Sequence, residues 1–497
     1  MLRPAWTSLL FPLLLALLAP PAGAAVFTVT KASDGNDGVC NADCSLREAV
    51  LSANAVPGST VIVPAGHYRL SLPPPDRIMN NPGDGSGGNL VVTAPMTIQG
   101  AGRDVTILDA RPSEQELQGI DRVLAVTSSG DLTLSGVTIT GGALLSQFDN
   151  GGGLKVSGGR LRIADSAIVQ NSTNGAGGGM EIHDSGQNPA VVEITRTEIL
   201  DNFARGPGGG IWTANGTVTV TDSTIAWNRS VTGGGGGIMN ANSGTRQITP
   251  MALLRVRRST IADNVSGNPL IDPLAGGVGG GIYNSSGRLE VENSTITRNE
   301  VRDIVLDPVG PMPAGRGGGI ASWAQLGDEV EDTAVVVNST IAWNRGAYGS
   351  QLHMQTQNDN LFELANTVIA GDGSDPNCAV QNAASGFHSH GGNVSSDASP
   401  CGLAWPADQA NVGPGVATAL ADHGGPTETL ALLDGSPALG FGVPDWCPQR
   451  DQRGAWRRVP CDSGAVEAVA VPEAGAAAGG AAAAGALALL RARRRRA

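Results

Sequence analysis

The sequence predicts an all-β fold: a right-handed parallel β-helix solenoid of about ten to twelve coils with a short N-terminal cap helix. Three observations predict it: a glycine-rich composition, two motifs that repeat together, and strand-like alternation between the motifs. Glycine supplies 71 of 497 residues and charged residues only 15%, which argues against helical bundles and coiled coils. Because 41% of the residues are hydrophobic, the chain can form a core, and the glycines indicate tight turns rather than disorder.

Each repeat carries two anchors, a glycine block that ends in an apolar residue and a motif of the form Ser/Thr-x-Ile-x-x-Asn. The final asparagines of successive copies are 31, 26, 36, 35 and 45 residues apart, so the insertions are confined to loops, as in solenoids. A β-propeller is the competing repeat, but the shortest copies cannot supply its blades of about 40 residues. The glycine blocks are 151–154, 177–180, 208–211, 235–238, 279–282 and 317–320, and the second motifs are 166–171, 197–202, 223–228, 259–264, 294–299 and 339–344.

Apolar residues recur two apart between the anchors, as at Leu161 and Ile163, which is the periodicity of β-strands. With two or three short strands in each repeat, no coil can bury its apolar face alone, so we expect parallel coils stacked about 4.8 Å apart. We expect the glycine blocks to form corners with positive φ and the repeated asparagines to stack in a ladder. Further strands are predicted at 60–63, 96–98, 105–108, 132–134, 137–140, 362–364 and 368–369.

Both ends of the chain have the composition of processing segments. Leu9 to Leu18 is an apolar run, and Ala22-Gly23-Ala24 fits the cleavage site of a secretory signal peptide. Residues 474–490 are uncharged and are followed by an arginine cluster, which predicts a short transmembrane stretch, with a disordered alanine-rich tail as the alternative. The net charge of −13 disfavours nucleic acid as a partner.

Six cysteines form three pairs that are local in sequence. An even number in an exported chain favours disulfides, although fifteen connectivities are possible, and we expect nearest-neighbour pairing. The Cys-x-x-Cys and His spacing of zinc sites is missing, so no metal site is expected. The predicted pairs are Cys40 with Cys44, Cys378 with Cys401, and Cys447 with Cys461.

Three segments resemble known families of exported bacterial proteins. Cys44-Ser45-Leu46-Arg47-Glu48-Ala49 resembles the CSLREA domain found near the mature N-terminus of β-helix proteins, and Ser45 and Glu48 fit a capping box, so we expect a helix that closes the stack. Segments within 424–467, including Asp451-Gln452-Arg453-Gly454, are similar to the choice-of-anchor C-terminal domain. Val471-Pro472-Glu473 with the apolar stretch and arginines resembles PEP-CTERM sorting signals of Gram-negative bacteria.

The repeats over about 150–345 also resemble those of chlamydial polymorphic outer membrane adhesins. Together these resemblances imply an exported protein at the cell surface or outside the cell, of Gram-negative type, with the tail in the membrane before processing. The predicted organisation is a signal peptide at 1–24, a CSLREA cap at 25–58, a β-helix at 59–400, a choice-of-anchor-like region at 401–470 and a sorting tail at 471–497.

Two columns of outward-facing residues are the candidate binding surfaces. One column follows the glycine blocks and the other precedes the repeated asparagines, and we expect the aromatic members Trp212, Tyr283, Trp227 and Trp343 to be exposed and to stack on sugar rings. The alternative is that these rings pack under inserted loops such as Asn242 to Pro250. The first column is Lys155, Glu181, Trp212, Met239, Tyr283 and Ala321, and the second is Gln170, Asp201, Trp227, Asp263, Arg298 and Trp343.

No catalytic residue is assigned from sequence. A hydrolase needs two carboxylates and a lyase a basic residue near a calcium site, and the fragments that match in part are more often ordinary surface groups. No cofactor is indicated, and calcium is possible but has no motif. The fragments are Glu181 with His183, Asp201 with Asp222, and Asp263 with Arg298, while His353, His388 and His390 are predicted to lie in later loops.

These observations favour an exported, surface-anchored, adhesin-like or glycan-binding protein without catalytic activity. The expected partner is an extracellular polysaccharide or another surface polymer, since exposed aromatic rings on a rigid β surface suit sugar rings. The alternative is a carbohydrate-active enzyme, either a polysaccharide lyase or a glycoside hydrolase, with its cleft along the stacked strands.

Overall fold

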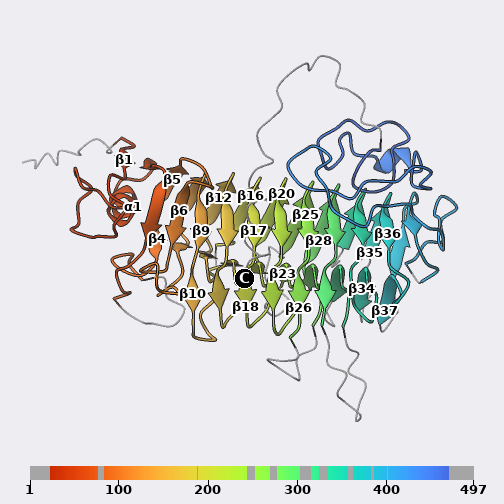
Figure 1. The fold of residues 1–497 in the computed structure, drawn as a ribbon, viewed down its shortest axis with the longest axis horizontal. Coiled ribbons are helices and arrows are strands. Elements are labelled where there is room, and N and C mark those ends of the chain that lie inside the picture. The colour runs from red at the N-terminus through yellow and green to blue at the C-terminus, as the bar shows by residue number, and fades with distance from the viewer. Residues whose placement is uncertain are drawn as a thin grey trace, which may run out of the picture.

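The computed structural model describes residues 23–75, 83–186, 188–242, 252–268, 277–302, 315–323, 334–355, 362–381, 386–399 and 401–468. The described chain forms four sheets, named A to D below. Each central coil contributes one strand to each sheet, in the order A, B, D and C, and all neighbouring strands within a sheet are parallel. The result is the elongated parallel β-helix of Figure 1. The sequence predicts two or three strands per coil, and the additional sheet D consists of two-residue strands.

Sheets A and B form two of the longitudinal faces. Sheet A contains β1 (Val26–Thr28), β2 (Ser59–Val63), β5 (Pro95–Gly100), β8 (Asp131–Ser135), β12 (Arg160–Ala164), β16 (Val191–Thr195), β20 (Thr217–Thr221), β24 (Leu253–Arg257), β28 (Arg288–Glu292), β32 (Ala334–Val337), β35 (Phe362–Ala365) and β38 (Phe387–Ser389). Sheet B contains β3 (Gly66–Arg69), β6 (Thr106–Asp109), β9 (Thr138–Thr140), β13 (Ala167–Val169), β17 (Glu198–Leu200), β21 (Thr224–Ala226), β25 (Thr260–Ala262), β29 (Thr295–Thr297), β33 (Thr340–Ala342), β36 (Val368–Ala370) and β39 (Val394–Ser395).

Sheets C and D complete the cross-section. Sheet C contains β4 (Leu90–Val92), β7 (Leu124–Val126), β11 (Leu154–Ser157), β15 (Met180–His183), β19 (Ile211–Ala214), β23 (Ile238–Ala241), β27 (Ile282–Ser285), β31 (Ile320–Trp323), β34 (Leu352–Gln355) and β37 (Cys378–Gln381). Sheet D contains β10 (Ala143–Leu144), β14 (Ser172–Thr173), β18 (Phe203–Ala204), β22 (Arg229–Ser230), β26 (Val265–Ser266) and β30 (Glu300–Val301). The strands predicted from sequence at 60–63, 96–98, 105–108, 132–134, 137–140, 362–364 and 368–369 are confirmed, with shifts of a residue or so at their ends.

The core is a set of apolar columns that run the length of the stack. Ile211, Ile238 and Ile282 are in register on adjacent strands of sheet C, and each is fully buried. The apolar residue that ends each glycine block therefore points inward, as the repeat predicts. Stability is shared between neighbouring coils, because each coil covers the apolar edge of the next.

The Ser/Thr-x-Ile-x-x-Asn motif forms two buried hydrogen-bond ladders. Asn202 donates its side-chain amide and its backbone N–H to the side-chain oxygen of Asn228, and Asn228 does the same toward Asn264. The backbone N–H of Ser223 likewise donates to the hydroxyl of Ser259 in the next coil. Both polar residues thus satisfy buried backbone groups at the corners of the coil, and the predicted asparagine ladder is confirmed.

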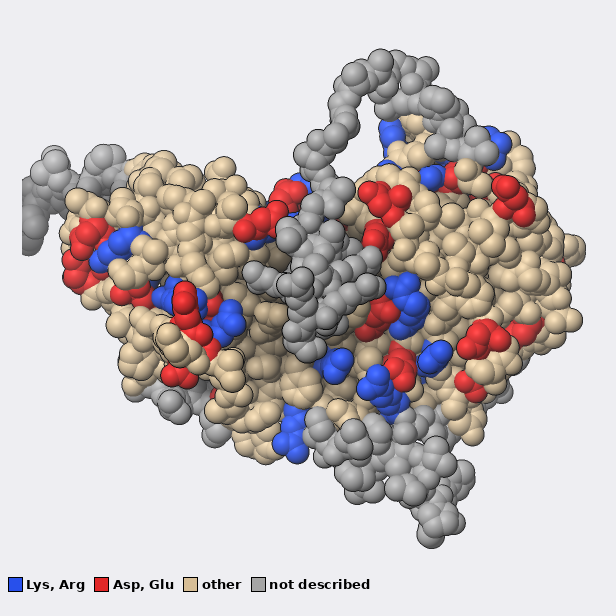
Figure 2. Space-filling model, viewed as in Figure 1, with Lys and Arg blue, Asp and Glu red and all other residues tan. Residues whose placement is uncertain are grey.

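The corners before each ladder have left-handed backbone conformation at residues other than glycine. Asp222 and Arg258 occupy one corner in consecutive coils, with φ of 53° and 48°, and their side chains pair at 2.8 Å. Asp165 and Arg196 pair in the same way at 2.7 Å. Acidic and basic groups adjoin one another on the face in Figure 2, so the exposed corners carry paired charges.

The glycine blocks stack so closely that no side chain fits. Gly208 has φ of 70°, which favours glycine. A Cβ on Gly209 would lie 2.4 Å from the carbonyl oxygen of Gly236 and 2.5 Å from the backbone of Arg229. Glycine is therefore required here by the approach of the next coil as well as by the turn, and the predicted positive-φ corner is confirmed.

A helix closes the N-terminal end of the stack. The helix α1 (Leu46–Ala55) begins after Ser45, which forms the predicted capping box with Glu48. The guanidinium of Arg47 is fully buried and pairs with Asp34 at 2.9 Å. Leu46 and neighbouring apolar residues of α1 join the solenoid core, so this segment acts as the predicted cap, while its membership of the CSLREA family stays a prediction.

The three disulfides are those expected from sequence. Cys378, in the last strand of sheet C, is bonded to Cys401, and both residues belong to the core at the C-terminal end. The other bonds join Cys40 to Cys44 and Cys447 to Cys461.

Residues 401–468 fold back along the outer face of sheet B instead of extending the stack (Figure 1). Leu430 and Leu432 pack on Val368 and Val394 of the solenoid, in a second apolar cluster. The amide of Gln452, from the Asp-Gln-Arg-Gly motif, accepts a hydrogen bond from the Thr295 hydroxyl at 2.6 Å and donates to the Thr260 hydroxyl at 2.8 Å. This region, which includes the 3-10 helix η1 (Pro444–Trp446), is therefore docked on the side of the β-helix.

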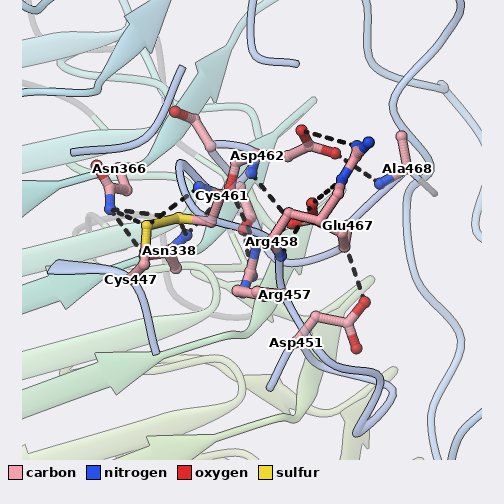
Figure 3. Close-up of polar contacts among 12 residues, drawn as sticks. Asn338, Asn366, Cys447, Asp451, Arg457, Arg458, Cys461, Asp462, Glu467 and Ala468 are labelled. Atoms are coloured by element: carbon pink, nitrogen blue, oxygen red, sulfur yellow. Dashed lines mark hydrogen bonds and ion pairs between the residues drawn. A yellow bond between two sulfur atoms is a disulfide. The ribbon is translucent and has the colours of Figure 1, made fainter. Parts of the chain in front are cut away.

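Buried charges hold the docked region in place (Figure 3). Arg457 donates to the side-chain oxygen of Asn293 in the solenoid at 2.8 Å and lies 3.5 Å from Glu467, whose side chain is fully buried. Burial lowers the pKa of Arg457 to about 10 although Asp451 and Glu467 oppose the shift. The solenoid corners beneath are Asn293, Asn338 and Asn366, so asparagine replaces the paired Asp and Arg corners where the region docks.

No helix within the described ranges is long and apolar enough to cross a membrane. The predicted transmembrane stretch at 474–490 and nearly all of the predicted signal peptide lie outside the described residues.

Candidate functional site

The outer face of sheet C carries a continuous line of chemically varied side chains. These residues are one position after the buried apolar column, so the strand alternation points them outward. Neighbouring members are in direct register on adjacent strands, which places consecutive side chains about 4.8 Å apart. We call this set the sheet C line: Lys155, Glu181, Trp212, Met239, Tyr283, Ala321 and His353.

A charged cluster occupies the N-terminal end of the sheet C line. The ammonium of Lys155 lies 2.9 Å from Oε2 of Glu181, and both side chains are 2% exposed. Nδ1 of His183, two residues further along β15, lies 3.3 Å from the other carboxylate oxygen of Glu181. The side-chain amide of Asn150 donates to that same oxygen at 3.2 Å. The predicted pairing of Glu181 with His183 is therefore a real contact.

The cluster keeps Glu181 ionised over the whole ordinary pH range. Burial alone would raise the pKa of this carboxyl, but the contact with His183 and the charge of Lys155 outweigh burial and hold the pKa at about 2. Burial lowers the pKa of Lys155 although Glu181 opposes that shift, and the charge of Arg122 lowers it further. Arg122 is itself 2% exposed, so two cations and one anion are packed together beneath the surface.

His183 is the accessible member of the cluster. Its side chain is 27% exposed, against 2% for Glu181. A carboxylate that contacts one nitrogen of an imidazole fixes the orientation of the ring. The pair is therefore arranged so that His183 can exchange a proton with a molecule on the outer face, with Glu181 behind it.

Aromatic and thioether side chains follow the charged cluster along the line. Trp212, Met239 and Tyr283 are in register on β19, β23 and β27, and all three are partly buried. Burial raises the pKa of the Tyr283 hydroxyl. The sequence predicts that Trp212 and Tyr283 are exposed, whereas the two rings present only part of their surface. The insertion at 242–250 offered as an alternative cover lies almost entirely outside the described residues.

The other two predicted aromatic residues lie away from sheet C. Trp227 and Trp343 are at left-handed corners directly after strands β21 and β33 of sheet B, with φ of 58° and 60°. Trp343 donates its indole N–H to the carbonyl of Ala417 at 2.8 Å and packs against the docked C-terminal region. Trp343 therefore has a packing role rather than the predicted exposed position, because residues 401–468 cover it.

The other two candidate catalytic pairs predicted from sequence lie at corners of the coil. Asp263 and Arg298 form an ion pair at 2.6 Å between adjacent corners. Asp222 pairs with Arg258 at a corner between sheets A and B, whereas Asp201 lies at a corner between sheets B and D. The predicted Asp201 and Asp222 fragment is thus divided between two different corners of the coil.

Two of the histidines predicted to lie in loops are in strands. His353 is in β34 and belongs to the sheet C line, and His388 is in β38. His390 follows β38, and its Nε2 contacts Oε2 of Glu363 at 3.1 Å. In the described part of the chain, no three His, Cys, Asp or Glu side chains are grouped as metal ligands would be.

Sequence reasoning did not single out Arg122, and it predicted a loop rather than a strand at His353. Arg122 directly precedes the buried run from Val123 to Val126, and a charge next to such a run is a usable signal of a buried polar site. His353 follows Leu352 in the position that other copies show after their glycine blocks. In this copy the glycine block is replaced by Gly349-Ser350-Gln351, so the motif does not mark the position of His353.

Comparisons with known proteins agree with the fold. The family model described as "right handed beta helix region" matches residues 122–328. The solved structure of pectate lyase Pel9A is similar over 89% of this chain and 96% of its own, with 16% identity and a TM-score of 0.50. The protein is therefore a right-handed parallel β-helix, as the sequence predicts.

Two further structures are more distant. The A-module of mannuronan C-5 epimerase AlgE4 from Azotobacter vinelandii covers 73% of this chain and 91% of its own, with 15% identity and a TM-score of 0.37. The catalytic domain of a GH87 α-1,3-glucanase covers 73% of this chain and 71% of its own, with 13% identity and a TM-score of 0.29. No curated protein matches the sequence.

Proposed function

We propose that this chain is a carbohydrate-active protein that binds an extended polysaccharide along the sheet C line and reacts with it at His183. The observation that carries the proposal is the contact of His183 with Glu181 at 3.3 Å, on the strand next to Trp212 of the sheet C line. Aromatic rings stack on the apolar faces of sugars. An oriented imidazole supplies proton transfer.

The spacing of the solenoid suits a linear polymer. Coils repeat about every 4.8 Å, so Trp212, Met239 and Tyr283 offer a contact at each step along the axis. The pectate lyase Pel9A has the same fold, which is compatible with this use of the β-helix. We also propose that the protein is exported and bound to the cell surface.

Glu181 and His183 have different roles in proton transfer at the cluster. Glu181 is a carboxylate above about pH 2, so it does not itself act as an acid, and the more exposed His183 beside it is the group that would exchange a proton. In a lyase-type reaction, His183 would remove a proton from a ring carbon next to a carboxyl group, while a C=C bond forms and the glycosidic oxygen leaves. In a hydrolysis, it would take the proton of the attacking water.

Binding without reaction is the second candidate. The observation that favours it is that Glu181 is 2% exposed and contacts Lys155, His183 and Asn150, as in a structural ion pair. The protein would then be the adhesin-like glycan binder that its repeats predict. Product formation separates the two candidates.

The test is a screen of the purified protein on acidic and neutral polysaccharides, with and without calcium. Binding, reducing ends and unsaturated ends are followed together. We expect His183→Ala to lower turnover by about 10²-fold or more while binding remains, because general base catalysis contributes about 10²–10⁴-fold. Binding without product in the wild type would select the second candidate.

Trp212→Ala tests the binding surface. We expect a loss of affinity of roughly tenfold, since an aromatic contact contributes about 0.5–1.5 kcal/mol beyond its area. Trp227→Ala is the matched control, because Trp227 is a partly buried tryptophan at a corner away from sheet C. Loss of binding in the control, with normal binding by Trp212→Ala, would place the site elsewhere.

A further inference from the structure

His353 is a buried histidine whose ring nitrogens have no hydrogen-bond partner. It lies at the C-terminal end of the sheet C line and is 2% exposed. Neither Nδ1 nor Nε2 forms a hydrogen bond of ordinary geometry in the described chain, although the backbone of Tyr348 and the charge of Arg316 lie near enough to affect the protonation of the ring. Buried polar groups normally have partners, so these two atoms call for an explanation.

The ring is neutral at ordinary pH. Burial, helped by the positive charge of Arg316, lowers the pKa of His353 to about 4. A neutral imidazole has one N–H donor and one acceptor nitrogen. The unpartnered atoms therefore offer one donor and one acceptor, which is the combination that a hydroxyl group satisfies.

The neighbouring residues extend this polar site. The side chains directly beside His353 in register are Ala321 and Ala379, both small. Gln381, diagonal to His353 on β37, has a buried side-chain oxygen without a partner. Arg316, whose charge influences His353, donates to the side-chain oxygen of Gln355 at 2.5 Å. The two nitrogens of His353 and the side-chain oxygen of Gln381 thus give this end of the line two acceptors and one donor that have no hydrogen-bond partner in the described chain.

We propose that His353 and Gln381, with Ala321 and Ala379 on either side, form a subsite for the hydroxyl groups of a neutral sugar. This inference rests on the proposed function and places one end of the polysaccharide here. A carboxylate is disfavoured as the recognised group, because a neutral imidazole offers it a single donor and the Gln381 oxygen would repel it.

The position of this subsite sets a minimum length for the ligand. Glu181 is on β15 and His353 is on β34, which are five strand steps apart in sheet C. At about 4.8 Å for each step, the two ends are separated by roughly 24 Å. A disaccharide is too short to reach both, whereas a hexasaccharide is long enough.

The test uses the full chain with ¹⁵N-labelled histidine and three pairs of neutral probes. These are cellohexaose with cellobiose, mannohexaose with mannobiose, and maltohexaose with maltose. We expect at least one hexasaccharide to shift the ring-nitrogen resonances of His353 and to bind about tenfold more tightly than its disaccharide. His353→Ala should remove that advantage, and the wild-type spectra give the result even if this variant folds poorly.

The outcomes separate this inference from the proposed function. If acidic polysaccharides bind and require Trp212, while neutral hexasaccharides do not bind, the neutral subsite is wrong and the proposed function stands. The same holds if a hexasaccharide quenches tryptophan fluorescence but leaves the His353 resonances unchanged. If no polysaccharide and no oligosaccharide binds, both proposals are wrong.

Discussion

Arg457→Ala is expected to destabilise the docked C-terminal region by about 3–5 kcal/mol, the usual effect of removing one partner from a buried charge pair. The substitution removes the buried cation that lies 3.5 Å from Glu467, whose carboxylate is itself fully buried. It also removes the hydrogen bond to Asn293 at 2.8 Å, which ties residues 401–468 to the solenoid. Hydrogen exchange should show faster exchange in this region, while the coils before Asn293 keep their protection.

Arg458→Ala is the matched control. Arg458 lies 3.1 Å from the same carboxylate of Glu467, but its side chain is 47% exposed. An exposed ion pair contributes less than about 1 kcal/mol, so we expect little change in unfolding. Equal effects of the two substitutions would contradict the role given to Arg457.

Gly209→Ala is expected to destabilise the solenoid by about 3 kcal/mol, the upper end of the usual range for overpacking. The added Cβ would be 2.4 Å from the Gly236 carbonyl oxygen and 2.5 Å from the Arg229 backbone. Backbone atoms cannot move aside as a flexible side chain does, so neighbouring coils must separate. Chemical denaturation followed by circular dichroism measures the loss.

Gly413→Ala is the control for this substitution, since a Cβ there would have no atom within 4 Å. We expect its unfolding midpoint to match the wild type within error. A Gly209→Ala protein as stable as Gly413→Ala would show that the glycine blocks are not packed as described.

The fold could be predicted because its anchors are local and repeat. The spacing of Ile211, Ile238 and Ile282 requires one inward column, and the asparagines of the second motif require a ladder, whatever the loops do. The corners were harder to predict. Asp222 and Trp227 adopt positive φ because ladders hold the chain on both sides. Aspartate is enriched in this conformation, but the residue type of Trp227 gives no such signal.

Docking of the C-terminal region could not be predicted, since it depends on contacts between residues far apart in sequence. Gln452 reaches Thr295 across 157 positions, and no local periodicity reports such a contact. The strand at His353 could not be predicted because the motif changes there: Gln351 replaces asparagine as the last acceptor of the ladder. The chemistry of the sheet C line likewise depends on register, which brings Lys155 against Glu181.

Hydroxyl-radical footprinting with and without a bound polysaccharide tests the central claim most directly. Trp212, Met239 and Tyr283 all oxidise readily, and all belong to the sheet C line. We expect their oxidation to fall when the polysaccharide is bound, while Trp405 of the C-terminal region, 54% exposed, is unchanged. Protection of Trp405 or Trp227, with no change at Trp212, Met239 and Tyr283, would contradict the assignment of the site to sheet C.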